Sequence, residues 1–263
     1  MKKILSTLIA LLSLTSCSVL QKLDSNRLMQ GGAKALQAFG VTNDQLMGYV
    51  KLSVLQLDAG AIVLPPSNNY SRRLARITKG LTSVGGIPLN FKVYKTNEPN
   101  AFACADGSVR IYTGLMDIMN DYELLGVIGH EIGHVAMEHT LNAYKHALYA
   151  SAAFDVIAST GDFAAALTDS VLGDLGQSMI SASFSRKQEI QADNYGYDFL
   201  KGAGINPWYM AMAFEQLQAA SQKGSLTTTS GIGTMFSSHP DTAARIEGIA
   251  KRCREDGFTR PEK

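Results

Sequence analysis

The chain has 263 residues, and its 24 basic and 23 acidic side chains leave a formal net charge of +1. Apolar residues make up 46% of the sequence and charged residues 18%, which is the composition of an ordinary globular protein. These values exclude a strongly basic nucleic-acid-binding protein, and no basic patch stands out in the sequence. We therefore expect no nucleic-acid partner.

The first residues have the pattern of an export signal. Lys2 and Lys3 precede an apolar run over residues 4–14, which is too short to span a bilayer as a permanent helix. Leu14-Thr15-Ser16-Cys17 then resembles a bacterial lipobox, in which the cysteine becomes the lipidated first residue of the mature chain. We predict a lipoprotein signal peptide over residues 1–16, and a lipidated cysteine with its tether over 17–23. A plain signal peptide with a coincidental Cys17 is the alternative.

The residue after the lipobox cysteine bears on location. Ser18 stands where an aspartate usually means retention in the inner membrane, so the resemblance to Gram-negative lipoproteins implies the outer membrane, facing the periplasm. No later stretch has the 18 or more uninterrupted apolar residues of a membrane helix. We expect membrane contact through the lipid only, and a single domain over residues 24–263 with a helical N-terminal part.

The first half of the chain changes from helical to strand-like patterns. Helical periodicity covers residues 28–39, 44–57 and 70–81. Strands are predicted over 91–94, 101–103 and 109–112, with a turn at Asp106-Gly107. An exposed edge of this small sheet could bind an extended peptide through backbone groups, and an edge covered by the N-terminal helices is the alternative.

The most demanding pattern is His130-Glu131-Ile132-Gly133-His134, within a predicted helix over residues 121–139. Two histidines four residues apart lie on one helix face, which suits two neutral imidazoles binding one zinc ion. Glu131 lies about a quarter-turn away, where it can act as a general base on water without binding the metal. A buried helix with incidental histidines is the alternative. Apolar residues fall on the opposite side of this helix, at Leu125, Ile128, Ile132 and Val135.

Gly126, Gly129 and Gly133 form a stripe without side chains beside the histidines. Each glycine destabilises a helix by about 1 kcal/mol relative to alanine. We therefore expect another backbone, or a substrate, to pass close to this stripe.

The second half is mainly helical. Residues 147–176 are rich in alanine, glycine and serine, and form either two loosely packed helices or a mobile flap over the site. Helices are predicted over 175–200, 207–220 and 241–254, with a polar loop over 222–237. The whole pattern predicts an α+β fold, predominantly helical, with a small sheet next to the active-site helix.

Two histidines leave a catalytic zinc one protein ligand short, because such sites use three protein ligands and an open position. The candidate is Glu189, and Asp193 one helical turn later could accept the outer ring N–H of a ligand histidine. The metzincin pattern is excluded, since Met137 and Thr140 stand where it needs glycine and histidine.

Two other features are less specific. His139 lies nearly opposite His130 on a continuous helix, so we interpret it as a surface or internally satisfied histidine. Cys104 and Cys253 could form a disulfide in an oxidising compartment, and two separate buried thiols are the alternative.

His-Glu-Ile-Gly-His followed by Glu-Ile-Gln-Ala-Asp resembles the gluzincin metallopeptidases related to HtpX and the CAAX prenyl endopeptidases. With the lipobox and no membrane helices, the chain looks most similar to the LoiP-type periplasmic lipoprotein metalloproteases. The resemblance runs from about residue 70 to 249, and includes the segments 100–103, 110–115, 184–186 and 238–240.

The resemblance implies a zincin-type fold and one Zn²⁺ per chain, bound by His130, His134 and Glu189. It implies that Glu131 is the catalytic base and that Asp193 supports a ligand histidine. It also favours peptide binding at the strand edge formed by Ala101, Phe102 and Ala103.

His239 is the remaining residue that the resemblance brings near the zinc. It would either stabilise the oxyanion or occupy the water position and hold the enzyme inactive. A histidine at the start of a helix with no catalytic part is the alternative. Arg245, on the helix that follows, is expected to position this segment through an ion pair.

The predicted function is that of a zinc-dependent endopeptidase, which hydrolyses peptide bonds in exposed or misfolded cell-envelope proteins as part of envelope protein quality control. The alternative is a periplasmic chaperone or outer-membrane assembly factor with weak or latent proteolysis. In both cases the expected partners are protein or peptide chains, chiefly unfolded envelope proteins.

Overall fold

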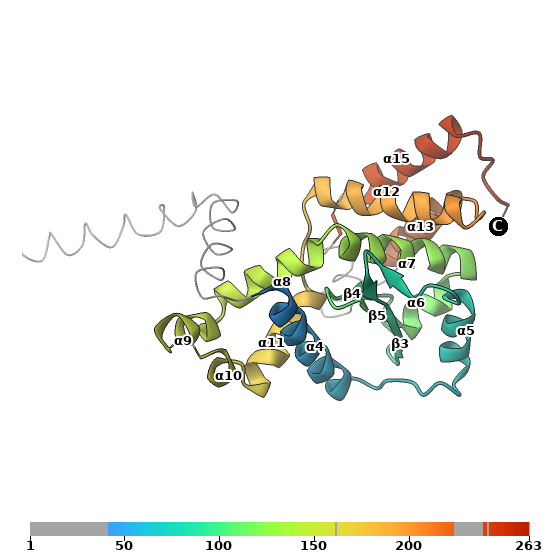
Figure 1. Cartoon of the computed structure of the whole chain (residues 1–263). Helices are drawn as coiled ribbons and strands as arrows, with labels where there is room; N and C mark the ends of the chain where they lie inside the picture. Colours follow the sequence, from blue (N-terminus) through green and yellow to red (C-terminus); the bar gives the residue numbers. More distant parts are fainter. Residues whose placement is uncertain (1–41, 161, 224–238, 241, 263) are drawn as a thin grey trace, which may run out of the picture. The chain divides into compact units, whose positions relative to one another are not determined.

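The computed structural model describes residues 42–160, 162–223, 239–240 and 242–262 (Figure 1). The predicted signal peptide, Cys17, the predicted helix over 28–39 and nearly all of the polar loop over 222–237 lie outside the described residues. Within the described ranges, no helix combines the length and the apolar character needed to cross a membrane.

A three-stranded sheet has the order β3-β5-β4, with β3 at Asn90–Tyr94, β5 at Ser108–Tyr112 and β4 at Ala101–Ala103. The central strand β5 runs parallel to β3 and antiparallel to β4. Gly107 turns the chain between β4 and β5 at φ +82°, a conformation that glycine adopts without strain. The three predicted strands and the turn are confirmed.

A second sheet was not predicted. It pairs β1 (Ser83–Val84) with β2 (Ile87–Pro88) in antiparallel orientation. Strands of two residues are too short for an alternating pattern to show in a sequence.

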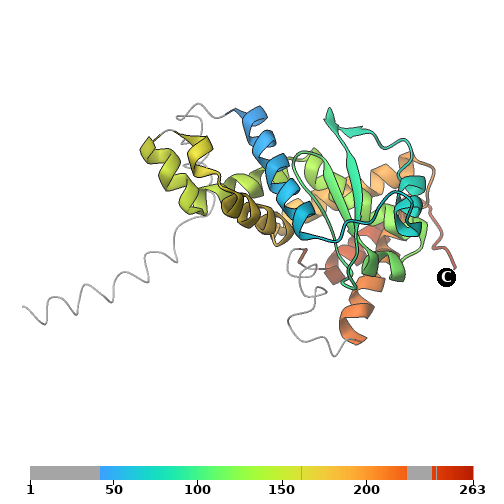
Figure 2. The same ribbon diagram turned by 90° about the horizontal axis from the view of Figure 1, so that it is seen from below.

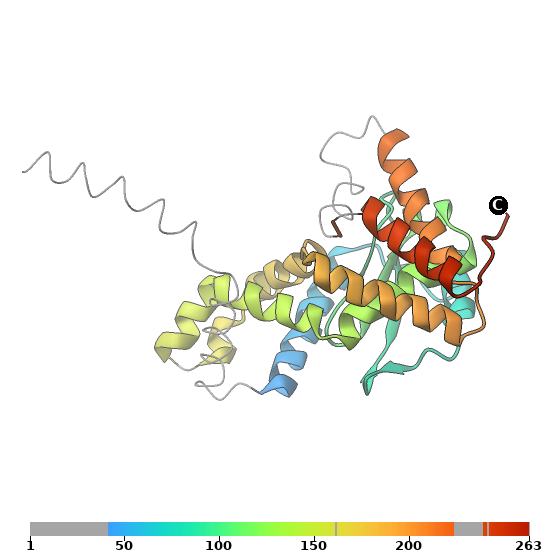
Figure 3. The same ribbon diagram turned by 90° about the horizontal axis from the view of Figure 1, so that it is seen from above.

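Helix α7 (Asp121–Ala136) is the central element of the fold. A capping box starts it: the Asn120 side chain accepts from the Glu123 backbone, and the Asn120 N–H donates to the Glu123 carboxylate. One side of α7 packs against β4 and β5, and the other packs against α12 (Arg186–Gly202) and α13 (Trp208–Lys223) (Figures 1 and 3). The four apolar positions predicted to pack are all buried: Leu125, Ile128, Ile132 and Val135.

The glycine stripe is where α12 and α13 contact α7. A Cβ atom at Gly126 would lie 2.9 Å from Met210 Cα on α13, and one at Gly133 would lie 3.0 Å from the Ala192 carbonyl oxygen on α12. Gly129 faces Phe199 and Gly196 of α12 in the same way. The predicted close approach of another backbone is therefore confirmed, and the partner is the helix that carries Glu189.

Two predicted helices are broken in the structure. The predicted helix over 121–139 ends at Ala136, and α8 (His139–Ala150) starts after Glu138, whose φ is +56°. Among the described residues Glu138 is the one non-glycine residue with positive φ. The predicted helix over 175–200 is likewise two helices, α11 (Asp169–Ile180) and α12, because Ser185 forms a capping box with Gln188 and starts α12.

Helices cover the remaining described chain. Residues 147–176, for which packed helices and a flap were both considered, form helices, and α11 packs against α4 (Figure 2). The last helix, α15, lies alongside α13 and also contacts α12 (Figure 3). The helices not yet given are α4 (Asn43–Gly60), α5 (Asn69–Ile77), α6 (Thr113–Ile118), α9 (Ala152–Thr160), α10 (Phe163–Ala166) and α15 (Thr242–Glu255).

The α+β, predominantly helical fold class is confirmed. Of the two alternatives for Cys104 and Cys253, the disulfide is not formed in this structure, in which both are free and buried. Cys104 follows β4, on the sheet side of α7, whereas Cys253 belongs to α15, which packs on the far side of α12 and α13. The two cysteines are therefore separate buried thiols, as in the second alternative.

The surroundings of two glycines predict opposite effects of glycine-to-alanine substitutions on the free energy of unfolding. Gly126→Ala should lower the free energy of unfolding by about 1–3 kcal/mol, because the added methyl group pushes against the α13 backbone. Gly248→Ala, in the middle of α15 with no atom within 4 Å of the new Cβ, should raise it by about 0.5–1 kcal/mol. Urea titrations of both variants test the difference, and a stabilising Gly126→Ala would contradict the close packing.

Candidate metal centre

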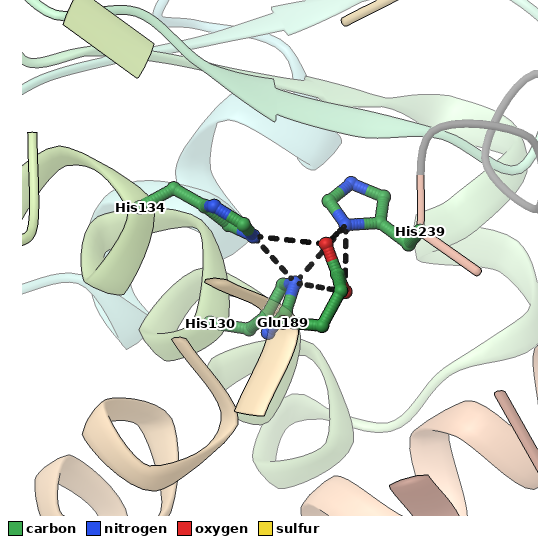
Figure 4. A group of neighbouring side chains, drawn as sticks. All are labelled: His130, His134, Glu189 and His239. Atoms are coloured by element: carbon green, nitrogen blue, oxygen red, sulfur yellow. Dashed lines mark hydrogen bonds and ion pairs between the residues drawn. The ribbon is translucent and has the colours of Figure 1, made fainter. Parts of the chain in front are cut away.

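Four buried side chains converge beside α7. His130 and His134 come from α7, Glu189 comes from α12, and His239 lies just before α15. Figure 4 shows all four pointing toward one another, and their potential ligand atoms all lie within 4.8 Å of each other. The structure therefore brings together the three predicted metal ligands and His239.

The spacing of these atoms fits a zinc ion. His130 Nε2 lies 3.1 Å from His134 Nε2 and 3.2 Å from His239 Nδ1. Glu189 Oε1 lies 3.1 Å from His239 Nδ1 and 3.5 Å from His134 Nε2. Tetrahedral zinc ligands with bonds of 2.0–2.1 Å are separated from one another by roughly 3.3 Å. Imidazole and carboxylate groups at these separations form a suitable zinc donor set.

The charge of the site also fits a divalent cation. Glu131, Glu189 and Asp193 are buried carboxyl groups, and the buried cation Arg245 contacts two of them, Glu189 and Asp193. When all three carboxyls are ionised, this set has two more negative charges than positive ones. A zinc ion would balance that charge without any further protein cation.

Asp193 and Arg245 form the layer behind the ligands. The His130 Nδ1–H donates to Asp193 Oδ1 at 2.9 Å, which leaves His130 Nε2 unprotonated toward the cluster. Arg245 lies 2.6 Å from both Glu189 Oε2 and Asp193 Oδ1. Burial opposes ionisation of Asp193, but the hydrogen bonds from Arg245 and His130 lower its pKa to about 2. The expected ion pair of Arg245 is present, and its partners are Glu189 and Asp193 of α12.

Glu131 lies where a general base is needed. Its side chain is buried, and within the described part of the chain its Oε1 has no hydrogen-bond partner. The nearest charged-group contact of this oxygen is His239 Nε2, at 3.6 Å. Burial raises the pKa of Glu131 despite the nearby His239 and His130. A carboxylate with a raised pKa is suited to accepting and returning a proton.

His239 lies between the base and the ligand carboxylate. Its Nδ1 faces Glu189 and its Nε2 faces Glu131. Burial by itself would lower the pKa of His239, but the hydrogen bond to Glu189 and the negative charges of both glutamates raise it above the ordinary value. His239 is thus in contact with the cluster, in addition to standing just before α15.

His139 is not a surface residue, so that part of its interpretation was wrong. It is 5% exposed, and its Nδ1 lies 3.1 Å from His134 Nδ1. Burial lowers the pKa of His139, although a hydrogen bond with Gln191 opposes the shift. The backbone turn at Glu138 makes this contact possible, and the uninterrupted helical pattern in the sequence concealed it.

The edge of β4 lies next to the same site. Asn100 and Cys104 bond to β5 through Tyr112 and Ser108, at 3.0 and 2.8 Å. Because antiparallel strands alternate their bonding direction, the backbone groups of Ala101 and Ala103 point away from β5. β4 is thus an edge strand of the sheet and packs beside α7, but Ala101, Phe102 and Ala103 are all buried, so the expected exposure of this edge is not seen. The Ala103 backbone also bonds to the Glu131 carboxyl.

Comparison with known proteins places the chain in a family. The family model described as Peptidase family M48 matches residues 68–253. The chain belongs to this family of metallopeptidases. M48 peptidases are zinc-dependent, and this chain is a zinc metallopeptidase whose possible metal site is the donor set of His130, His134, Glu189 and His239.

Similar M48 proteins include two from Escherichia coli strain K12. The metalloprotease LoiP is 38% identical over 257 residues, which are 97% of this chain and 99% of LoiP. The metalloprotease YcaL is 38% identical over 240 residues, 91% of this chain and 92% of YcaL. The mitochondrial metalloendopeptidase OMA1 of Arabidopsis thaliana is 30% identical over 170 residues, 62% of this chain and 32% of OMA1.

Arg245 provides a test of the buried charge network in this M48 peptidase. Arg245→Met should lower the free energy of unfolding of the zinc-free chain by about 3–5 kcal/mol, because two buried carboxylates lose their counter-ion. Arg254→Met is the control on the same helix, since Arg254 pairs with Glu247 at the surface, and a change of about 0–1 kcal/mol is expected. Urea unfolding measures both, and equal effects would mean that the Arg245 network adds no stability.

Proposed function

We propose that this chain is a zinc endopeptidase in which His130, His134 and Glu189 bind the metal and Glu131 is the general base. The observation that carries this proposal is the buried Glu131 oxygen with no hydrogen-bond partner in the described chain, directly beside a His-His-Glu donor set. A site that only stabilised the fold would have no use for such a carboxylate.

Zinc, when bound, supplies a Lewis acid that polarises the scissile carbonyl and makes water a better nucleophile near neutral pH. Glu131 takes a proton from the attacking water and then delivers it to the leaving amine. Asp193 holds His130 in the tautomer that binds metal, and Arg245 holds both Asp193 and Glu189 in place.

The substrate is proposed to bind along β4 as an added strand. The outward carbonyl groups of Ala101 and Ala103 can accept from an extended peptide whatever its side chains, whereas the Ala101 N–H already donates to Asn100 Oδ1 at 2.9 Å. Phe102, between them, bonds to β5 and keeps this edge in register. Such binding favours unfolded or exposed segments, because a folded substrate has no free strand to offer.

The cellular role is proposed from the sequence. Cys17 as a lipidated residue would anchor the enzyme to the outer membrane on its periplasmic face, where exposed or misfolded envelope proteins are the available substrates. This role is protein quality control in the cell envelope.

One observation favours a second candidate function. His239 offers a fourth ligand atom, and closed four-ligand sites are usually structural. The chain would then be a periplasmic chaperone or outer-membrane assembly factor with weak or latent proteolysis. The two candidates are separated by incubating the zinc-loaded chain with a denatured envelope extract and sequencing the new termini, because only the peptidase generates them, and a chelator should stop it.

The role of Glu131 is tested by Glu131→Gln, which preserves shape and removes the base. We expect unchanged zinc content and a fall of about 10²–10⁴-fold in the cleavage rate of a denatured, fluorescently labelled protein. Glu247→Gln, at the surface of α15, is the control and should leave the rate unchanged. A Glu131→Gln variant with full activity would refute the assignment.

His239 is proposed to occupy the fourth position of the metal site and to hold the enzyme inactive. His239→Ala should therefore raise the cleavage rate several-fold while three protein ligands still retain zinc, because the fourth ligand atom no longer occupies the site. His146→Ala, with its histidine on α8 away from the cluster, should have no effect on the rate. If His239→Ala keeps its zinc but loses activity, His239 instead assists the reaction.

A further inference from the structure

We propose that His139 and Gln191 form a relay that fixes the tautomer of His134 and thereby sets how tightly the site binds zinc. The inference rests on the zinc ligation proposed above. It concerns two residues that do not touch the metal position, and both act through His134.

The relay follows from the direction of each hydrogen bond. His134 can bind metal through Nε2 only if that nitrogen carries no proton, so the proton of the neutral ring must be on Nδ1. That Nδ1–H points at His139 Nδ1, 3.1 Å away, which must therefore accept. A neutral His139 that accepts at Nδ1 carries its own proton on Nε2. Gln191 Oε1 lies 3.2 Å from His139 Nε2 and can accept that proton.

The opposite arrangement is incompatible with the site. If Gln191 donated its amide N–H to His139 Nε2, His139 would carry its proton on Nδ1 and donate it to His134. His134 would then be protonated on Nε2, the atom that faces His130 Nε2 at 3.1 Å and Glu189 Oε1 at 3.5 Å. Metal binding thus selects one proton arrangement along the whole chain of three side chains.

The backbone conformation between α7 and α8 brings His139 into contact with His134. On a continuous helix, five residues would place His139 about 140° around the axis from His134. The break after Ala136 and the left-handed Glu138 return the chain so that His139 meets His134. A left-handed residue other than glycine costs about 1–2 kcal/mol, so a position that adopts this conformation is held there by its surroundings.

The two ligand histidines are therefore supported in different ways. His130 donates to the charged Asp193, which Arg245 holds, whereas His134 donates to a neutral imidazole held by Gln191. Gln191 lies between Glu189 and Asp193 on α12. One helix thus supplies a ligand and, on its neighbouring positions, the groups that orient both histidines.

The test measures zinc affinity of the full-length chain by competition with a chromogenic chelator. His139→Ala should weaken zinc binding about 10–100-fold, the usual effect of removing a group that orients a ligand histidine. His139→Asn should restore affinity to within a few-fold of the unsubstituted chain, because Asn Oδ1 takes the place of His Nδ1 and accepts the same N–H. His146→Ala, a histidine change on the same helix, is the control and should leave affinity unchanged.

Two substitutions of Gln191 provide a second test. Gln191 is exposed, so these substitutions should not change the stability of the fold. Gln191→Leu should weaken zinc binding, and Gln191→Glu, which still accepts from His139 Nε2, should not. As a direct readout of the proton position, ¹⁵N-histidine spectra of the zinc-loaded chain should show a slowly exchanging Nδ1–H on His134. That signal should be lost in His139→Ala and kept in His139→Asn.

The outcomes distinguish the relay from the ligation on which it rests. If His134→Ala binds zinc as tightly as the unsubstituted chain, the proposed ligation is wrong. If His134→Ala loses zinc while His139→Ala binds it normally, the ligation stands and the relay is overturned. An affinity of His139→Asn no better than that of His139→Ala would also overturn it, since the loss would then reflect packing alone.

Discussion

The close approach of α7 and α12 is the contact on which the rest of this structure depends. Glu189 can reach the two histidines because α12 lies against a stripe of glycines on α7, with Ala192 facing Gly133. Side chains at Gly126, Gly129 and Gly133 would meet atoms of α12 and α13 at 2.7–3.0 Å, closer than ordinary van der Waals contact, and would push the helices apart. A packing feature without chemistry of its own thus sets the geometry of the metal site.

Burial of charge is the second constraint. Three carboxyl groups lie together in the interior, and of these Arg245 contacts only Glu189 and Asp193, an arrangement that is unfavourable unless the remaining negative charge is compensated. A divalent ion provides that compensation. Zinc binding should for this reason raise the free energy of unfolding of the chain, in addition to serving the reaction. Metal binding and folding are then coupled.

Asp193 and Glu131 are both buried carboxyl groups, but their pKa values shift in opposite directions. Asp193 accepts hydrogen bonds from Arg245 and His130 and has a lowered pKa, so it stays ionised beside His130. Glu131 is buried without such partners and has a raised pKa, so it can exchange a proton. Differences in hydrogen bonding, more than residue type, thus give the two carboxyl groups opposite pKa shifts.

Much of the metal site follows from local patterns in the sequence. The spacing of His130 and His134, the glutamate beside the first histidine, and Glu189 with Asp193 one turn later are local patterns on helices, so their relative directions follow from helical geometry. The glycine stripe indicated a close neighbour, and the strands with their turn were evident from alternation. These features need no knowledge of distant parts of the chain.

Other contacts of the site depend on long-range packing and have no local signal in the sequence. The pairing of His134 with His139 depends on a left-handed residue at Glu138, a conformation that its side chain does not favour and that no local pattern reveals. The positions of His239 and of the two free cysteines depend on how α15 packs. Long-range packing sets which groups meet, because it depends on surfaces contributed by segments far apart in the sequence.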